Sequence, residues 1–287
     1  MLGLGVYVAL LIMLCFACSD TIAKKVSDKI GSKRTTLVML ASSIIPLLIG
    51  VCFFGLSKIN PATIIFSAIS GLLYALAFFL LYKSLETEQV SNTISLNGIE
   101  WVMITGFSIL ALGESVTFPQ LLCFVGVLVG AFLVTTAKKF VFNRGYIPAI
   151  ASMVAFGCVY IFRIYALQNS GGVLLPNLIS VIMALLAMFV YLRLSPESNK
   201  KFRKVRLASD RRTLAKNMIL GVLQGTGSLL LLTLATLNFV AVGSMIVAAE
   251  PALVILLGYT LYKDRFVAHQ VVGFVLLILS VLILSAL

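Results

Sequence analysis

Long apolar runs recur along the whole chain, separated by short stretches that carry most of the charged, Gly, Asn and Pro residues. Each run is close to the ~20 residues that an α-helix needs to cross a hydrocarbon core of about 30 Å. Breaking the chain at charges and turn-forming residues predicts helices over 3–23, 36–57, 62–83, 89–112, 117–137, 146–168, 173–194, 214–236, 239–262 and 266–286. The pattern therefore predicts an all-α integral membrane protein with ten transmembrane helices.

Composition supports this fold class. Of the 287 residues, 61% are hydrophobic and 11% are charged, whereas soluble proteins carry about 25% charged residues. The apolar runs are continuous, unlike the alternating segments of about ten residues in a membrane barrel. The apolar start shows no small-residue cleavage site, so we expect no removable signal peptide.

The distribution of basic residues predicts an orientation. All but two of the 22 Lys and Arg residues fall on one side of the predicted bundle. The exceptions are Lys58 and Arg163, and Arg163, like Lys83, is expected close enough to a helix end to reach the membrane surface. The positive-inside rule then places the basic loops in the cytoplasm and both termini outside the cell membrane. The long basic loop 195–213 is expected to contact anionic lipid, and no nucleic-acid partner is expected, because only Phe202 supplies an aromatic ring there.

The two halves of the chain repeat one another. At an offset of 150 residues Glu100 aligns with Glu250 and Gly71 with Gly221, and at an offset of 140 "FAC" at 16–18 aligns with "FGC" at 156–158. The predicted units are residues 1–140 and 141–287, each with five helices. Because five is odd, the second unit enters the membrane upside down, an arrangement typical of secondary transporters with a site at the repeat interface.

Several of these segments resemble a known family. "FACSD" and "FGCVY" open the two halves, and "GIEWVMITGFSILALGE" and "AAEPALVILLGYTLYKD" follow later, the second with Glu250-Pro251. Over essentially the whole chain the pattern is similar to the drug/metabolite transporter superfamily, in particular its ten-helix EamA-type permeases. The resemblance implies a transporter and not an enzyme. The superfamily moves amino acids, drugs, sugars and phosphates, so it implies no single substrate.

Glu100 and Glu250 lie about midway along their predicted helices and are equivalent in the repeat. A charge at the bilayer centre costs roughly 2.5–3.5 kcal/mol on insertion scales, so an acid there indicates a functional site by default. Two carboxylates in a low-dielectric cavity cannot both ionise at low cost, which favours exchange of protons against a cationic substrate. The alternative is structural: each acid is a neutral hydrogen-bond partner, and Glu250 repairs the kink at Pro251.

Other polar and aromatic residues are expected around these acids. On the helix of Glu100, Thr93 and Asn97 share its face and Trp101 is adjacent. Asp20 either faces the cavity or pairs with Lys24 four residues later. Aromatic rings beside acids suit an amine through cation–π attraction, although ordinary packing also explains them. The candidate substrate- or proton-binding residues are Asp20, Tyr74, Asn97, Glu100, Trp101, Tyr160, Gln224 and Glu250.

The leading hypothesis is a secondary transporter, proton-coupled, of a small cationic or zwitterionic metabolite such as an amino acid, an amine or an organic-cation drug. A phosphate-bearing substrate or nucleotide sugar needs Lys or Arg inside the membrane, and the candidates are expected near helix ends. An intramembrane enzyme with a carboxylate dyad and a channel stay open. No cofactor or metal is expected from the one His and five Cys residues, and Gly126-x-x-x-Gly130 predicts a close helix contact that would also suit a homodimer.

Overall fold

The computed structural model describes residues 2–87, 96, 98–135, 146–194, 211–262 and 268–287. Throughout these ranges the regular structure is α-helix. The elements are α1 (Leu2–Ile30), α2 (Ser32–Phe54), α3 (Pro61–Thr87), α5 (Gly98–Ala111), α6 (Phe118–Thr135), α7 (Tyr146–Ser170), α8 (Leu174–Leu194), α10 (Arg211–Thr236), α11 (Val240–Val247), α12 (Glu250–Tyr262) and α13 (Ala268–Ala286).

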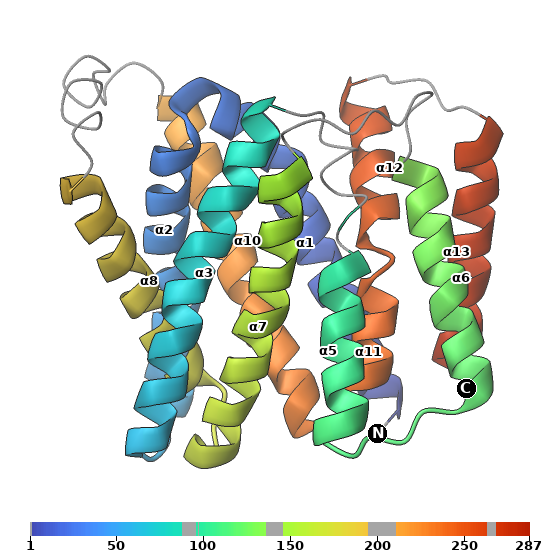
Figure 1. Ribbon diagram of the computed structural model, residues 1–287, viewed down its shortest axis with the longest axis horizontal. Helices are drawn as coiled ribbons and strands as arrows, with labels where there is room; N and C mark the ends of the chain where they lie inside the picture. Colours follow the sequence, from blue (N-terminus) through green and yellow to red (C-terminus); the bar gives the residue numbers. More distant parts are fainter. Residues whose placement is uncertain (1, 88–95, 97, 136–145, 195–210, 263–267) are drawn as a thin grey trace.

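The helices stand side by side as membrane spans (Figure 1). In the described part of the chain, nine helical segments of 18–28 residues reach a mean hydropathy of 1.8–2.5, with α11 and the start of α12 counted as one, and α5 is a shorter apolar helix. Large apolar side chains such as Phe53, Leu110 and Val272 are exposed on the outside of the bundle, where lipid tails cover them. Both termini lie at the lower face in Figure 1, and the corner between α1 and α2 lies at the upper face.

Contacts between the two halves come in matched pairs, as an inverted repeat requires. α3 packs along α7 and α8, and its repeat mate α10 packs along α1 and α2. α5 contacts α7, while α11 and α12 contact α1. A methyl group on Gly71 of α3 would lie 2.4 Å from the Ser180 carbonyl oxygen of α8, and one on its mate Gly221 would lie 2.3 Å from the Met39 carbonyl oxygen of α2. These glycines let each pair of helices approach closely, and the ten-helix fold with two inverted repeats is confirmed.

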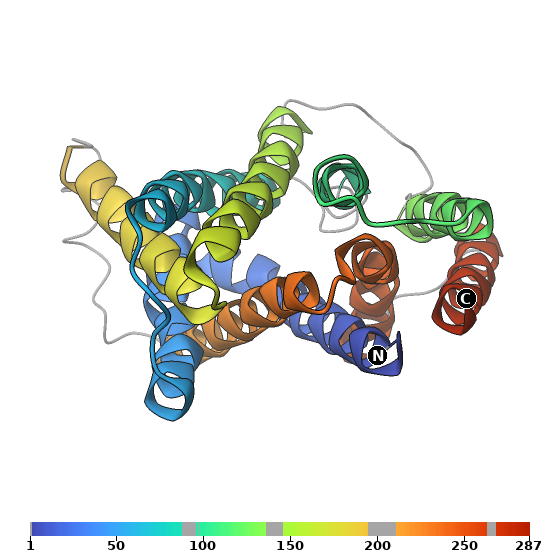
Figure 2. The same ribbon diagram turned by 90° about the horizontal axis from the view of Figure 1, so that it is seen from below.

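The glycine motif of α6 is used inside the chain. Gly126 and Gly130 face α13, where an added methyl group would lie 2.4 Å from the Ser280 hydroxyl and 2.9 Å from the Gly273 carbonyl oxygen. α6 and α13 form one edge of the molecule, as the end-on view shows (Figure 2). The predicted close helix contact is confirmed, and its partner is α13 of the same chain.

The helices differ from the prediction at the α1–α2 junction and before α12, and one further predicted helix start cannot be compared. α1 continues to Ile30 and α2 starts at Ser32, so the basic residues between the first two spans are helical, and the chain turns at Gly31 alone (φ 82°). The helix predicted over 89–112 is described from Gly98 onward, and 89–95 and 97 lie outside the described residues. The continuous helix predicted over 239–262 is wrong: Ala248 and Ala249 form a turn between α11 and α12. Pro251 has no N–H to donate, so the expected kink becomes a break.

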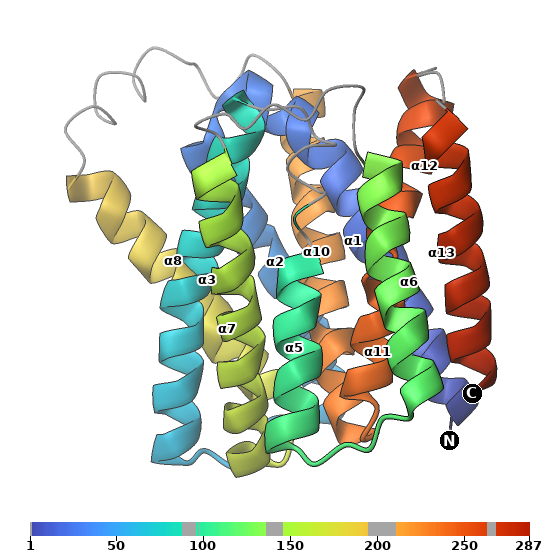
Figure 3. The same cartoon turned by 45° about the vertical axis from the view of Figure 1, so that its right-hand side comes forward.

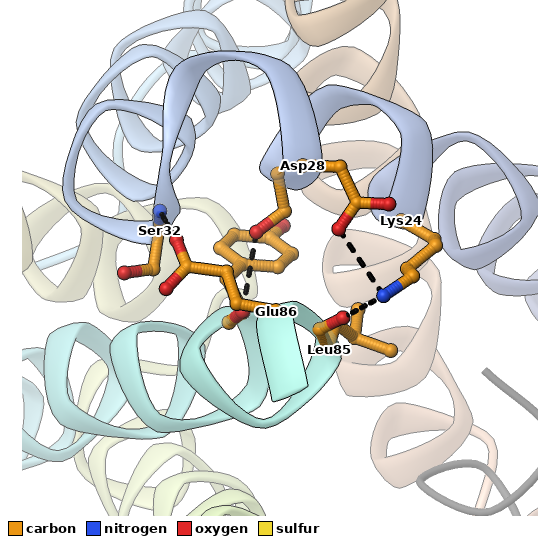
Figure 4. A network of polar contacts seen from close by, with 7 residues as sticks. Lys24, Asp28, Ser32, Leu85 and Glu86 are labelled. Carbon is orange, nitrogen blue, oxygen red and sulfur yellow. Dashed lines mark hydrogen bonds and ion pairs between the residues drawn. The ribbon is translucent and has the colours of Figure 1, made fainter. Parts of the chain in front are cut away.

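Acidic side chains hold helix ends together at both faces. At the upper face Glu86, near the end of α3, accepts a hydrogen bond from the Ser32 backbone N–H at the start of α2 (Figure 4). Close by, Lys24 pairs with Asp28 at 3.1 Å and donates to the Leu85 carbonyl oxygen.

At the lower face Glu114 accepts hydrogen bonds from the backbone N–H groups of Val240 (3.0 Å) and Ala241 (2.7 Å) at the start of α11. Both carboxylates satisfy N–H groups that a helix start leaves free. Glu114 thereby fastens the end of α5 to the opposite repeat.

Candidate functional site

A small cavity lies among six helices that the repeat relates in pairs. The lining residues are Phe16 and Asp20 of α1, Phe78 and Leu81 of α3, Glu100 and Trp101 of α5, Met153, Phe156 and Tyr160 of α7, Gln224 of α10 and Glu250 of α12.

Three carboxyl groups converge on this cavity, and we call Asp20, Glu100 and Glu250 the acidic cluster. Their exposed fractions are 8%, 7% and 2%. Asp20 lies within hydrogen-bonding reach of Glu250 and accepts a longer hydrogen bond of 3.5 Å from Nε2 of Gln224. Glu100 is near enough to Asp20 for their charges to interact. Asp20 therefore belongs to the cavity and contacts Glu250, while Lys24 pairs with Asp28.

Glu100 and Glu250 owe their positions to two helix starts. Glu100 lies in the first turn of α5 and Glu250 is the first residue of α12. α5 and α11 occupy the lower half of the molecule side by side, and α12 continues above α11 (Figure 3). Both glutamates therefore lie near mid-depth, beside helix N-termini whose N–H groups and dipoles favour negative charge. The turn at Ala248–Ala249 and the start of α5 at Gly98 are related by the offset of 150 residues, so the repeat is preserved in the site itself.

Aromatic rings form the rest of the wall. Phe78 and Phe156 meet edge to face at 4.7 Å between ring centroids, and Phe16 lies 6.4 Å from Trp101. Trp101 is 1% exposed and is the only tryptophan in the chain. Such rings provide a cation–π surface beside the carboxylates.

Most of the predicted site residues are brought together. Asp20, Glu100, Trp101, Tyr160, Gln224 and Glu250 all line the cavity. Tyr74 is fully buried behind the wall, where its ring packs 4.7 Å from Phe78. Asn97 and Thr93 lie outside the described residues. The apolar lining residues Leu81 and Met153 were not predicted, because an apolar side chain on an apolar helix gives no signal in the sequence.

The observed position of Arg163 contradicts the prediction made for it. It was expected to reach the membrane surface from a helix end, yet its side chain is 0% exposed. Its guanidinium carbon lies 4.2 Å from the ring centroid of Tyr74 and 5.7 Å from that of Tyr160. α7 extends to Ser170, seven residues beyond Arg163, so the side chain lies inside the helix bundle instead of at its end. The prediction failed because the face of the helix on which Arg163 lies was not considered.

An inverted repeat of five helices around a buried, charged cavity defines a polytopic membrane protein of the transporter type. Comparison with known proteins agrees: residues 3–136 and 143–286 each match the EamA-like transporter family. The chain belongs to this family and is a multi-pass membrane transporter of the drug/metabolite transporter superfamily. No curated protein matches it. A solved structure described only as "Crystal structure of protein" covers 98% of this chain and 98% of its own, with a TM-score of 0.72 and 14% identity, which shows the fold alone.

Proposed function

We propose that this protein is a secondary transporter that exchanges protons against a small cationic or zwitterionic metabolite, such as an amino acid, an amine or an organic-cation drug. The observation that carries the proposal is the convergence of Asp20, Glu100 and Glu250 on one buried cavity. Acidic residues buried at membrane depth mark ion pathways and proton relays in transporters.

The chemistry follows from the closeness of these acids. Three carboxylates in a medium of low dielectric constant repel one another strongly, so the cluster needs either bound protons or a bound cation. The contact between Asp20 and Glu250 favours one shared proton between the two groups. A substrate ammonium group and protons therefore compete for the same oxygens, which is the requirement for exchange.

The aromatic wall favours an organic cation over a metal ion. Phe16, Phe78 and Trp101 line the cavity beside the acids, and rings attract ammonium groups through their π faces. Within the described residues, no three His, Cys, Asp or Glu side chains are grouped so that they could hold a metal ion. The lining thus offers an organic ammonium ion both carboxylate groups and ring faces.

A ligand screen tests the proposal. Purified protein is heated with amino acids, amines and nucleotide sugars, and a ligand that binds only the native state raises the unfolding temperature. We expect an amine or amino acid to stabilise the protein, less so as the pH falls, because protons occupy the same carboxylates. Stabilisation by nucleotide sugars alone would contradict the proposal, and recovery of a chemically altered ligand would indicate an enzyme.

Orientation has its own test. We propose that the protein lies in the cell membrane with its basic loops in the cytoplasm and its termini outside. In a background without the five native cysteines, Ser198→Cys, outside the described residues, should resist an impermeant thiol reagent in intact cells. Asn169→Cys, near the end of α7 at the opposite face, should react. The reverse pattern would overturn the orientation and leave the fold intact.

A further inference from the structure

Arg163 belongs to a second polar group, which we call the arginine site: Arg163 and Tyr160 of α7, Tyr74 of α3, Ser228 of α10 and Asn177 of α8. The Nη1 group of Arg163 donates a hydrogen bond to the Ser228 hydroxyl, and that hydroxyl donates to Oδ1 of Asn177 at 3.1 Å. The hydroxyl of Tyr74 lies close to both Arg163 and Ser228. Four helices thus hold one guanidinium group.

This site is incomplete. In the part of the chain that the structure describes, Nε and Nη2 of Arg163 have no hydrogen-bond partner, and no carboxylate lies within 4 Å of the guanidinium group. An arginine side chain keeps its proton in proteins, so this group cannot become neutral as a carboxyl can. Buried charges are normally paired, and two free N–H donors on a planar fork match the two oxygens of an oxyanion.

The arginine site lies next to the cavity, on the side toward the termini. Arg163 follows Tyr160 by three residues, Ser228 follows Gln224 by four, and Tyr74 precedes Phe78 by four on α3, which runs the opposite way. Tyr160, Gln224 and Phe78 all line the cavity. Each step from the cavity to the arginine site is therefore about one helix turn in the same direction.

We propose that Arg163 binds the carboxylate of the transported substrate, so that the substrate is a zwitterion with its ammonium group on the acidic cluster. The proposal rests on the proposed function and narrows it from amines in general to amino acids. Arg163 is not among the lining residues, and Tyr160 both lines the cavity and has its ring centroid 5.7 Å from the guanidinium carbon, so binding requires the ring of Tyr160 to turn aside.

The short distance between the two sites and the single positive charge of Arg163 both favour an amino acid as the substrate. The arginine site lies about one helix turn from the cavity, and one turn rises only about 5.4 Å, so a short distance separates the two sites. The ammonium and carboxylate groups of the substrate must therefore lie close together. A phosphate group, with a charge of about −1.5 to −2, exceeds what one guanidinium neutralises and would lie beside three acids.

Fluorescence of Trp101, the only tryptophan, reports directly on the cavity that it lines. The probes are phenylalanine and leucine, their decarboxylated amines phenethylamine and 3-methylbutylamine, and phosphoethanolamine. Each is titrated into wild-type protein, Arg163→Gln and Arg163→Lys. The matched control is Arg193→Gln, which removes an arginine stacked 5.0 Å from the Phe189 ring at the end of α8, away from the cavity.

We expect Arg163→Gln to raise the Kd of an amino acid about tenfold or more, as loss of a charged hydrogen bond does, and to leave its amine within about threefold. Arg163→Lys should recover part of the affinity for the amino acid. Arg193→Gln should change neither the Kd of the amino acid nor that of the amine. If Arg163→Gln does not purify as a monodisperse protein, two other measurements test the role of Arg163. These are the Kd values of Arg163→Lys and the ratio of the amino-acid Kd to the amine Kd in wild-type protein.

Equal weakening of amino acid and amine, or no wild-type preference between them, overturns the role of Arg163 and leaves the proposed function standing. Tighter binding of phosphoethanolamine that depends on Arg163 overturns the choice of carboxylate. If none of the probes binds wild-type protein, the proposed function fails together with this inference.

Discussion

The acidic cluster in the cavity and the arginine site next to the cavity both bury charge, but in different ways. Asp20 and Glu250 contact one another, Gln224 donates to Asp20, and all three acids can take up protons. Arg163 donates a hydrogen bond to Ser228 and rests on the rings of Tyr74 and Tyr160. Because guanidinium cannot lose its charge, the acidic cluster is complete without a ligand and the arginine site is not.

The largest expected change in stability lies in the acidic cluster. Glu250→Ala leaves the buried carboxyl group of Asp20 with only the long hydrogen bond from Gln224, and loss of a partner by such a group costs about 1–3 kcal/mol. Glu250→Gln is the control, because its amide can still donate to Asp20 and should lose less. Thermal unfolding of the purified variants without ligand measures the difference. An alanine variant as stable as wild type would show that the two carboxyl groups do not depend on each other.

The arginine site should respond in the opposite direction. Arg163→Met fills a similar volume without a buried charge, and we expect the free energy of unfolding without ligand to rise by about 1 kcal/mol, as replacement of buried ionic groups often does. Thermal unfolding of purified Arg163→Met and wild-type protein without ligand tests this expectation. A loss comparable to that of Glu250→Ala would mean that the guanidinium group is a structural element and would remove the contrast between the two sites.

A smaller effect is expected for an acid outside both sites. Glu114→Ala deletes the cap on α11, where two backbone N–H groups lose their acceptor, and should lower stability by about 0.5–1 kcal/mol. It should not alter the pH dependence of ligand binding, followed by Trp101 fluorescence. A changed pH profile would show that this acid, about one α5 length from Glu100, contributes to the titration assigned to the acidic cluster.

The sequence predicts the fold well because two of its signals are global. Continuous apolar runs fix ten spans, and offsets of 150 and 140 residues relate the halves, so Glu100 and Glu250 are correctly placed near each other in one cavity. Both signals average over many residues, and an error of several residues at one helix end does not affect them.

The local features were harder to predict. Arg163 was assigned to a membrane surface from its distance to a predicted helix end, although Phe156, Tyr160 and Arg163 lie on one face of α7 at i, i+4 and i+7 spacing. That spacing was the signal that could have placed it beside the cavity. The break before Glu250 depends on which carbonyl groups remain satisfied around Pro251, and this is a tertiary property that the sequence does not carry.

The central claim is that the acidic cluster binds protons and substrate in turn. Proton movement in liposomes tests this claim most directly. The protein is reconstituted with a pH-sensitive dye inside, and the amine or amino acid that gives the largest thermal shift is added outside. Glu100→Gln keeps size and hydrogen bonding but cannot titrate, so substrate-driven proton movement should stop while the protein stays folded, and Glu114→Gln should behave like wild type. Unchanged transport rate and pH profile in both Glu100→Gln and Asp20→Asn would contradict the account.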